Sequence, residues 1–402
     1  MHSSQRQLFF NHLAQTSDFP LALEIERAEG VFLYGQDGKR YFDLISGIAV
    51  SNVGHRHPEV LAAIHAQLDK YLHLMVYGEY VQSPQVKLAE ALVNTLALSY
   101  ESPSPFGLID SVYFTNSGTE AVEGAMKLAK RYTGRPEFIS CVNAYHGATQ
   151  GALSISGAEF FKRNFRPLLP GIKQIQHGHL PDLEKISCRT AAVVIEVIGG
   201  ESGVRIPSSA YFHALRQRCT DVGALLVFDE IQTGFGRTGT FWASENVGVY
   251  PDILLSAKGM GGGMPIGAFM ASTQLMAVFR DNPILGHITT FGGHPVSCAA
   301  SLATLQVIRS QNLAEQANAK GELIKSLLVH PKIKEVRGQG LMLAAEMESF
   351  EVLKPIIDRC ILAGVITDWF LFCDNSMRIA PPLTISEGEI REAMGVISGI
   401  LG

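Results

Sequence analysis

Two short apolar segments, each followed by one ionisable residue, limit the folds open to this chain. Leu225–Phe228 precedes Asp229, and Ile253–Leu255 precedes, after two small residues, Lys258. Apolar runs of this length between turn-forming residues are typical of buried strands in a parallel sheet. Because ligands of such sheets bind outside the carboxyl ends of the strands, we expect the Asp229 carboxylate and the Lys258 amine to face one cavity.

The residues after Lys258 bear on the chemistry of this pair. A buried lysine beside a buried carboxylate is often only a structural ion pair, which is the alternative interpretation. Here a planar ligand has room to approach the backbone, because four of the following residues lack a side chain: Gly259, Gly261, Gly262 and Gly263. This favours a lysine that carries a covalent cofactor. The best known case is pyridoxal phosphate, held as a Schiff base with its pyridinium nitrogen paired to a carboxylate.

Composition argues against several other classes of protein. The 402 residues carry a net charge of −5, whereas nucleic-acid-binding proteins show basic patches. The six cysteines form no C-x-x-C pair, and the His-x-His pairs at 55–57 and 177–179 lack a third ligand of suitable spacing. No apolar run reaches the ~18 residues of a membrane-spanning helix, and the N-terminus lacks the apolar core of a signal peptide. We expect a cytoplasmic protein without metal, nucleic-acid or membrane partners.

Strands and helices alternate from about residue 50 to residue 290, which predicts an α/β fold with a mostly parallel, doubly wound sheet. Near the N-terminus, Asp37-Gly38 predicts the turn of a hairpin. Residues 300–402 indicate a smaller α/β unit with two strands, and its last helix begins with the capping box Ser386-x-x-Glu389. We predict that 1–50 and 296–402 form a small domain and that 51–295 form a large domain that binds the cofactor.

The segment Asn116-Ser-Gly-Thr-Glu120 follows a predicted strand and begins a helix. Ser117 and Glu120 have the spacing of a capping box, so a plain helix start is the simplest interpretation. The functional interpretation is that the free N–H groups of Gly118 and Thr119, together with the helix dipole, bind a phosphate.

Further polar or aromatic residues lie near predicted strand ends or in loops. Tyr145 is either a core residue or a flat surface for a cofactor ring. Glu196 is hard to explain as packing, because a lone buried carboxylate is costly. Glu201 lies in a glycine-rich loop, and Arg378 is suited to bidentate carboxylate binding, a surface salt bridge being the alternative.

Residues 234–239 match the dinucleotide fingerprint G-x-G-x-x-G, but we reject this motif. Residues 230–233 separate it from the preceding strand, and no apolar-periodic helix follows it. A dinucleotide-dependent oxidoreductase is therefore the least favoured alternative.

Six motifs in order resemble the class III (ω-amino acid) aminotransferases, over nearly the whole chain. They are Asn116–Ala121, Tyr145–Gly147, Phe228–Gly234 with Gly236–Gly239, Ser256–Gly259, Thr290–Gly293 and Val336–Gly340. The resemblance, to acetylornithine, ornithine and 4-aminobutyrate enzymes, implies the fold type I of pyridoxal-phosphate-dependent transferases. It implies transfer of an amino group from an ω-amino donor to an α-oxo acid such as 2-oxoglutarate. A mutase, racemase or decarboxylase on the same fold is the alternative.

The resemblance also implies roles for single residues. Lys258 would form the Schiff base with pyridoxal phosphate and move the proton, and Asp229 would keep the pyridine nitrogen protonated. Thr290 would reach the cofactor of the neighbouring subunit, which implies a homodimer with shared active sites. The remaining cofactor-binding residues would be Ser117, Gly118, Thr119, Tyr145, His146, Glu196, Ile231 and Gln232. The substrate-binding residues would be Ile48, Glu201 and Arg378, with Glu201 releasing Arg378 for the oxo acid.

The sequence departs from this family at one place that concerns the donor. The enzymes that it resembles usually have an arginine directly after the aromatic-x-Gly element, where it binds a substrate carboxylate, and this chain has Ala148 there. The resemblance therefore leaves the donor open. Ile48 agrees with the acetylornithine type, whereas ornithine enzymes tend to have tyrosine at that position.

Overall fold

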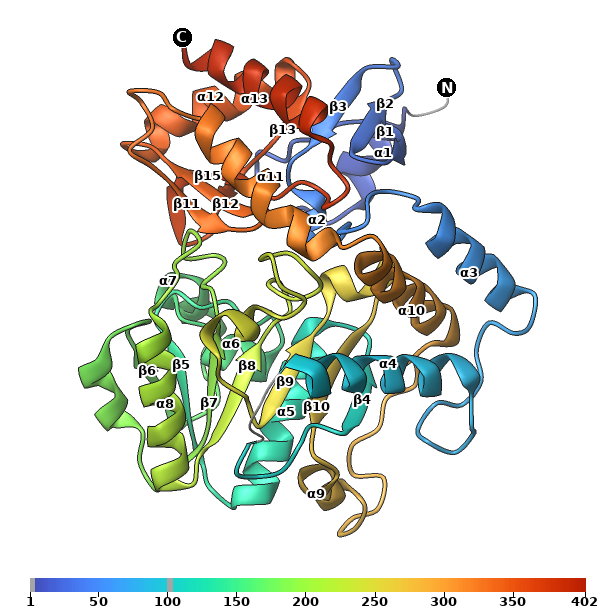
Figure 1. Cartoon of the computed structure of the whole chain (residues 1–402), viewed down its shortest axis with the longest axis vertical. Coiled ribbons are helices and arrows are strands. Elements are labelled where there is room, and N and C mark those ends of the chain that lie inside the picture. Colours follow the sequence, from blue (N-terminus) through green and yellow to red (C-terminus); the bar gives the residue numbers. More distant parts are fainter. Residues whose placement is uncertain (1–3, 100–103) are drawn as a thin grey trace.

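The computed structural model in Figure 1 describes residues 4–99 and 104–402. Its centre is a seven-stranded sheet with the order β4-β10-β9-β8-β7-β5-β6. The neighbours from β6 to β9 pair in parallel, and β10 is antiparallel to both of its neighbours. The predicted mostly parallel sheet is thus confirmed. Its strands are β4 Ser111–Thr115, β5 Glu137–Cys141, β6 Ile172–Ile175, β7 Thr190–Glu196, β8 Leu225–Asp229, β9 Ile253–Ser256 and β10 Gly267–Ala271.

The central strands are apolar throughout because helices cover both faces of the sheet. Successive side chains of a strand point to opposite faces. In β8, Leu226 and Phe228 join an apolar cluster with helix α8 (Ser209–Val222). Leu225 and Val227 join a cluster with helix α5 (Gly118–Thr133) on the other face. A strand buried on both faces needs an unbroken apolar run, which is the pattern that predicted it.

The two ends of the chain come together above this sheet (Figure 1). β13 (Val365–Ile366) pairs in parallel with β3 (Arg40–Asp43), in a four-stranded sheet ordered β1-β2-β3-β13. A second four-stranded sheet has the order β11-β12-β15-β14. The other strands are β1 Ile25–Glu29, β2 Phe32–Gly35, β11 Glu335–Gln339, β12 Met342–Glu346, β14 Trp369–Phe370 and β15 Cys373–Ile379.

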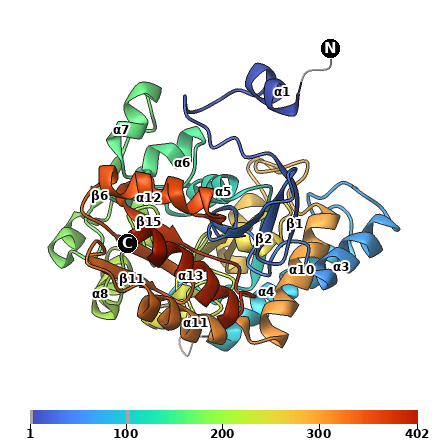
Figure 2. The same cartoon turned by 90° about the horizontal axis from the view of Figure 1, so that it is seen from above.

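The remaining helices lie around these sheets, and α1 stands away from the rest of the molecule in Figure 2. Their bounds are α1 Gln5–His12, α2 Ser46–Ala49, α3 Pro58–Leu68, α4 Ser83–Ser99, α6 Gln150–Ile155, α7 Glu159–Lys162, α9 Thr273–Met276, α10 Pro295–Ser310, α11 Leu313–Leu327, α12 Phe350–Leu362 and α13 Glu387–Leu401. The 3-10 segments are η1 Arg163–Phe165, η2 Leu180–Lys185, η3 Ala243–Val247, η4 Lys258–Gly261 and η5 Ala277–Phe279. No helix in the described ranges is both long and apolar enough to cross a membrane.

Several local predictions can be compared with these elements. The Asp37-Gly38 hairpin is confirmed by the antiparallel pairing of β2 with β3, and the Ser386/Glu389 capping box forms at α13. The prediction of two strands in residues 300–402 was wrong, since the structure has five there, β11 to β15. Two of them, β13 and β14, have only two residues each, too short to show an alternating pattern. The boundaries 1–50, 51–295 and 296–402 stay a prediction.

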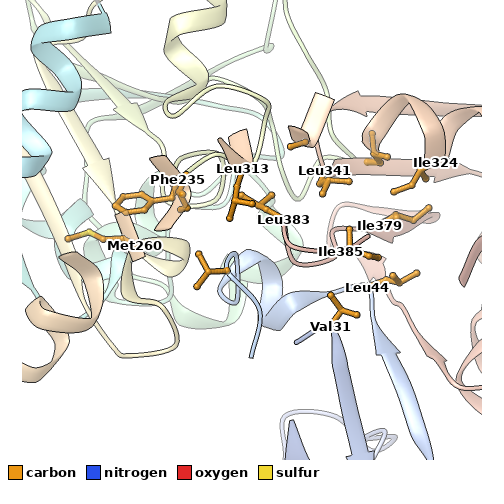
Figure 3. Packing of buried hydrophobic residues seen from close by; sticks show 14 of the residues in the cluster. Val31, Leu44, Phe235, Met260, Leu313, Ile324, Leu341, Ile379, Leu383 and Ile385 are labelled. Atoms are coloured by element: carbon orange, nitrogen blue, oxygen red, sulfur yellow. The ribbon is translucent and has the colours of Figure 1, made fainter. Parts of the chain in front are cut away.

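The two four-stranded sheets are here called the end sheets. An apolar cluster connects them to the large sheet (Figure 3). It joins Phe235 and Met260 to Leu313, Leu341 and Leu383. The rejected fingerprint at residues 234–239 contributes Phe235 to this cluster. There the fully buried Arg237 donates hydrogen bonds to the carbonyl groups of Leu341 and Pro381 and to the side chain of Asn52. This segment therefore connects distant parts of the chain, and it does not begin a helix.

Candidate active site

A cavity of about 500 Å³ opens at the carboxyl ends of the central strands. Glu196 is the last residue of β7, Asp229 is the last residue of β8, and Lys258 follows the end of β9. The parallel register places Glu196 beside Asp229. All three side chains line the cavity, at the sheet edge where the sequence placed Asp229 and Lys258.

Lys258 faces this cavity without a bonded partner. Its side chain makes no hydrogen bond or ion pair with any residue in the described ranges, so the alternative of a structural ion pair with Asp229 is wrong. Burial lowers the pKa of Lys258, although the charges of Glu201 and Asp229 act in the opposite direction. A lowered pKa favours the neutral amine, which is the nucleophilic form.

Asp229 is bonded to His146 instead. His146 Nδ1 lies 2.7 Å from Asp229 Oδ2, and the side chains are 0% and 4% exposed. The other oxygen of Asp229 accepts a hydrogen bond of 3.1 Å from the N–H of Ile231. Burial acts against a cationic imidazole, but the hydrogen bond that the imidazole donates to Asp229 and the charges of Asp229 and Glu196 raise the pKa of His146. The pair therefore places a carboxylate that is bonded to a buried histidine in the lining of the cavity.

Glu196 lies next to Asp229 in the parallel register of β7 and β8. Burial, together with the charges of Asp229 and Glu201, raises its pKa to about 7. Its carboxyl group accepts hydrogen bonds from the N–H groups of Gly200, at 3.0 Å, and Tyr145, at 3.4 Å. Glu196 thus fixes the loop that carries Tyr145 and the loop that leads to Glu201.

The N-terminus of α5 forms a wall of the cavity that fits a phosphate. Ser117 Oγ accepts a hydrogen bond from the N–H of Glu120. The predicted capping box is only half formed, because the Glu120 carboxylate bonds the N–H and the side chain of Asn116 instead. The N–H groups of Gly118 and Thr119 donate to no described residue and are available to an anion.

Apolar side chains shape the space beside this helix end. A Cβ atom on Gly118 would lie 2.8 Å from Ile231 Cδ1, so Ile231 would have to shift to admit a side chain there. Ile231 and Tyr145 both line the cavity, as does Gln232, whose amide bonds Glu201 at 3.4 Å. A phosphate cup, two hydrophobic surfaces, a buried carboxylate and an unbonded amine together fit pyridoxal phosphate.

Glu201 and Arg378 form a buried ion pair at the far side of the cavity. Arg378 Nη1 and Nη2 lie 3.0 Å from the two oxygens of Glu201, a bidentate geometry. Burial raises the pKa of Glu201, but the guanidinium outweighs this effect and holds it below the usual value. Glu201 lines the cavity, whereas Arg378 lies behind it. The alternative of a surface salt bridge for Arg378 is therefore wrong, since both side chains are buried.

Besides Arg378, two predicted residues do not line the cavity of this chain. Thr290 is exposed and lies outside it, and Ile48 is half-buried with a positive φ of 64°. Val50 lines the cavity instead. The cavity wall Met264-Pro265-Ile266 was not predicted, although it directly follows the glycines after Lys258 and was detectable from that position. Ala148, the departure from the family pattern, lines the cavity.

The known proteins that this chain resembles are aminotransferases. The family model Aminotransferase class-III matches residues 13–401. The chain is 37% identical over 393 residues to the acetylornithine aminotransferase of Methanopyrus kandleri, covering 97% of this chain and 96% of that protein. It is 40% identical over 397 residues to the putrescine aminotransferase of Pectobacterium atrosepticum, covering 92% and 81%.

The fold of this chain is also that of a solved transaminase structure. An amine transaminase from an uncultivated Pseudomonas species, solved in the PLP-bound form, has a TM-score of 0.87 and 28% identity, over 97% of this chain and 98% of that one. The chain therefore belongs to the class III aminotransferases, as its six motifs predicted.

Proposed function

We propose that this class III aminotransferase moves an amino group from an ω-amino donor to an α-oxo acid such as 2-oxoglutarate, with Lys258 as the residue that carries pyridoxal phosphate. The single observation that supports this role is the unbonded amine of Lys258, which faces a cavity with the paired carboxylate of Asp229. The family assignment does not favour the mutase, racemase or oxidoreductase alternatives.

Each residue of the site has its own role toward the cofactor. When bound, pyridoxal phosphate supplies an electron sink that stabilises negative charge next to the transferred nitrogen. Lys258 would hold the aldehyde end and move the proton, and Asp229, bonded to His146, would pair with the ring nitrogen. Gly118 and Thr119 would bind the phosphate through their N–H groups. Tyr145 and Ile231 would flank the ring, and Gln232 and Glu196 line the same cavity.

Arg378 is the candidate for binding the carboxylate of the oxo acid. In the structure its two Nη atoms are occupied by Glu201, so an incoming carboxylate takes the place of the Glu201 carboxylate. Arginine offers two parallel donors that match a carboxylate. This exchange serves the oxo-acid half-reaction, whereas an amine without a carboxylate at that end leaves the Glu201–Arg378 pair closed.

Arg378→Ala is therefore expected to impair one half-reaction selectively. Each charge-assisted hydrogen bond contributes about 1.5–3 kcal/mol, so the rate of the oxo-acid half-reaction should fall by roughly 10²-fold. The donor half-reaction should change far less. Both are measured by stopped-flow absorbance of the bound cofactor, with the donor selected from ornithine, N-acetylornithine, 4-aminobutyrate and putrescine. Arg359→Ala, an exposed arginine on α12, is the matched control. Equal losses in both half-reactions would contradict the role of Arg378.

We further propose a homodimer with shared active sites, in which Thr290 reaches the cofactor of the partner subunit. The segment around Thr290 supports this, because four apolar side chains are exposed there: Ile284, Leu285, Ile288 and Phe291, by 71%, 55%, 49% and 54%. Exposed apolar patches of this kind mark protein interfaces. The cytoplasmic location stays a prediction.

Light scattering after gel filtration should give twice the mass of the chain. Phe291→Glu should reduce it toward the monomer, because a charge placed in an apolar interface loses its hydration. Phe19→Glu, at a side chain that is 90% exposed, is the control. A monomeric native protein that still transfers amino groups would refute the shared site.

A further inference from the structure

The Arg378 guanidinium has three contacts besides its ion pair with Glu201. Its Nε donates a hydrogen bond of 2.8 Å to Asp368 Oδ1, on the edge opposite the cavity-lining carboxylate. The ring of Phe370 lies 4.4 Å from the guanidinium carbon, and the carbonyl group of Trp369 accepts a hydrogen bond of 3.4 Å. The contacts to Asp368, Trp369 and Phe370 are independent of Glu201.

Asp368 belongs to the same strand framework as Arg378. The N–H of Arg378 donates to the carbonyl group of Asp368 at 2.9 Å, and the hydroxyl of the buried Thr367 donates to the carbonyl group of Arg378 at 2.6 Å. These bonds place Asp368 on the connection between β13 and β14, directly beside β15, which carries Arg378. The Asp368 carboxylate is therefore fixed relative to the arginine by the backbone itself.

Glu201 is held in another way. It lies in the loop after β7, where its carboxylate also accepts from the N–H of Leu371 at 3.1 Å and from Gln232 at 3.4 Å. It lines the cavity, and Asp368 does not. Of the two carboxylates bonded to Arg378, only Glu201 stands where a substrate carboxylate would arrive.

We infer that Asp368 is a positioning residue that keeps the Arg378 guanidinium aimed at the cavity when the substrate carboxylate replaces Glu201. This inference rests on the proposed role of Arg378 in oxo-acid binding. Asp368 has two opposing physical effects. Its negative charge weakens the attraction between Arg378 and an anionic substrate, whereas its hydrogen bond orients the two Nη donors before the substrate binds. Positioning predicts weaker oxo-acid binding without Asp368, and charge alone predicts tighter binding.

The test compares three variants of the holoenzyme. Asp368→Ala removes both charge and hydrogen bond, and its KM for 2-oxoglutarate should rise by about tenfold or more, since a hydrogen bond to a charged group is lost. Asp368→Asn keeps an oxygen that accepts from Nε, so it should retain most of the affinity. Asp368→Glu keeps the charge but displaces it, and its KM should rise. The donor half-reaction should stay within about twofold of native in all three.

A binding titration and a control variant show whether a rise in KM comes from weaker binding of the oxo acid. Calorimetric titration with glutarate, a dicarboxylate that cannot react, reports binding without turnover and should weaken in the same order. Asp374→Ala, an exposed aspartate on β15, is the matched control and should change neither quantity. If Asp368→Ala does not fold, Asp368→Glu decides the question alone.

The outcomes also distinguish this inference from the proposed function. Unchanged or tighter oxo-acid binding in Asp368→Ala, while Arg378→Ala is impaired, overturns the positioning role alone. If Arg378→Ala leaves the oxo-acid half-reaction intact, the proposed acceptor site itself is wrong. A loss in both half-reactions of Asp368→Ala, not rescued by asparagine, assigns Asp368 a purely structural role and also overturns the inference.

Discussion

Lys258→Ala is expected to abolish amino transfer and to leave the fold intact. The loss in turnover should be at least about 10²–10⁴-fold, which is the usual contribution of one positioned acid or base. The fold should survive because the Lys258 side chain makes no hydrogen bond or ion pair within the described ranges, so its removal leaves no buried group without a partner. Far-UV circular dichroism and the thermal midpoint of the cofactor-free variant should therefore match those of the cofactor-free native protein.

Chemical trapping identifies the same residue independently of turnover. Borohydride reduction of the native holoenzyme, followed by peptide mass mapping, should leave a pyridoxyl group on Lys258 and on no other lysine. The Lys258→Ala variant should stay unlabelled. Lys334→Ala, at an exposed lysine whose side chain makes no hydrogen bond or ion pair with the described residues, should be labelled and active like the native protein. Labelling of another lysine, or turnover without Lys258, would contradict the proposed role.

The large sheet was predictable because its strands carry their own signal. Leu225–Phe228 and Ile253–Leu255 lie in β8 and β9, and in each case the observed strand extends one residue beyond the predicted run. In the two end sheets the Asp37-Gly38 turn signalled the hairpin of β2 and β3, but the pairing of β3 with β13 had no such signal. β13 has two residues, and its partner β3 lies at the other end of the chain. Pairing over that distance depends on how the whole chain packs, which no local pattern records.

Some contacts of the candidate site were predictable from the sequence, and others were not. Asp229, Glu196 and Lys258 meet because the carboxyl ends of neighbouring parallel strands share one edge of the sheet, a rule that holds without coordinates. The bond between His146 and Asp229 was not predicted, because it depends on how the loop after β5 folds over β8. Asp368 had no local signal either, since only the pairing of β14 with β15 brings it to Arg378. The catalytic roles themselves stay predictions.

Asp229→Asn is expected to lower both the stability and the activity of the protein. His146 is fully buried, and Asp229 is its ionic partner. Removing one partner of a buried pair costs about 3–5 kcal/mol in the free energy of unfolding, because the other charge loses its compensation. The rate of amino transfer should fall by roughly 10–100-fold, since one charge-assisted hydrogen bond to the ring nitrogen, about 1.5–3 kcal/mol, is lost. The effect on the rate is smaller than that of Lys258→Ala.

The difference in the free energy of unfolding between the native protein and Asp229→Asn should decrease as the pH rises. The pKa of His146 is raised above 6.5 in the folded protein by its pairing with Asp229, against the effect of burial. A group whose pKa is higher in the folded state binds its proton more tightly there, so its contribution to stability is complete below pH 6.5 and declines as the pH rises through the raised value. Urea unfolding over a pH series should therefore show the largest gap between the native protein and Asp229→Asn at acidic pH, and a narrowing gap above it. Asp358→Asn, which removes an exposed carboxylate on α12, should show no such trend. A gap that stays constant or widens with rising pH would contradict the raised pKa of His146 in the folded protein.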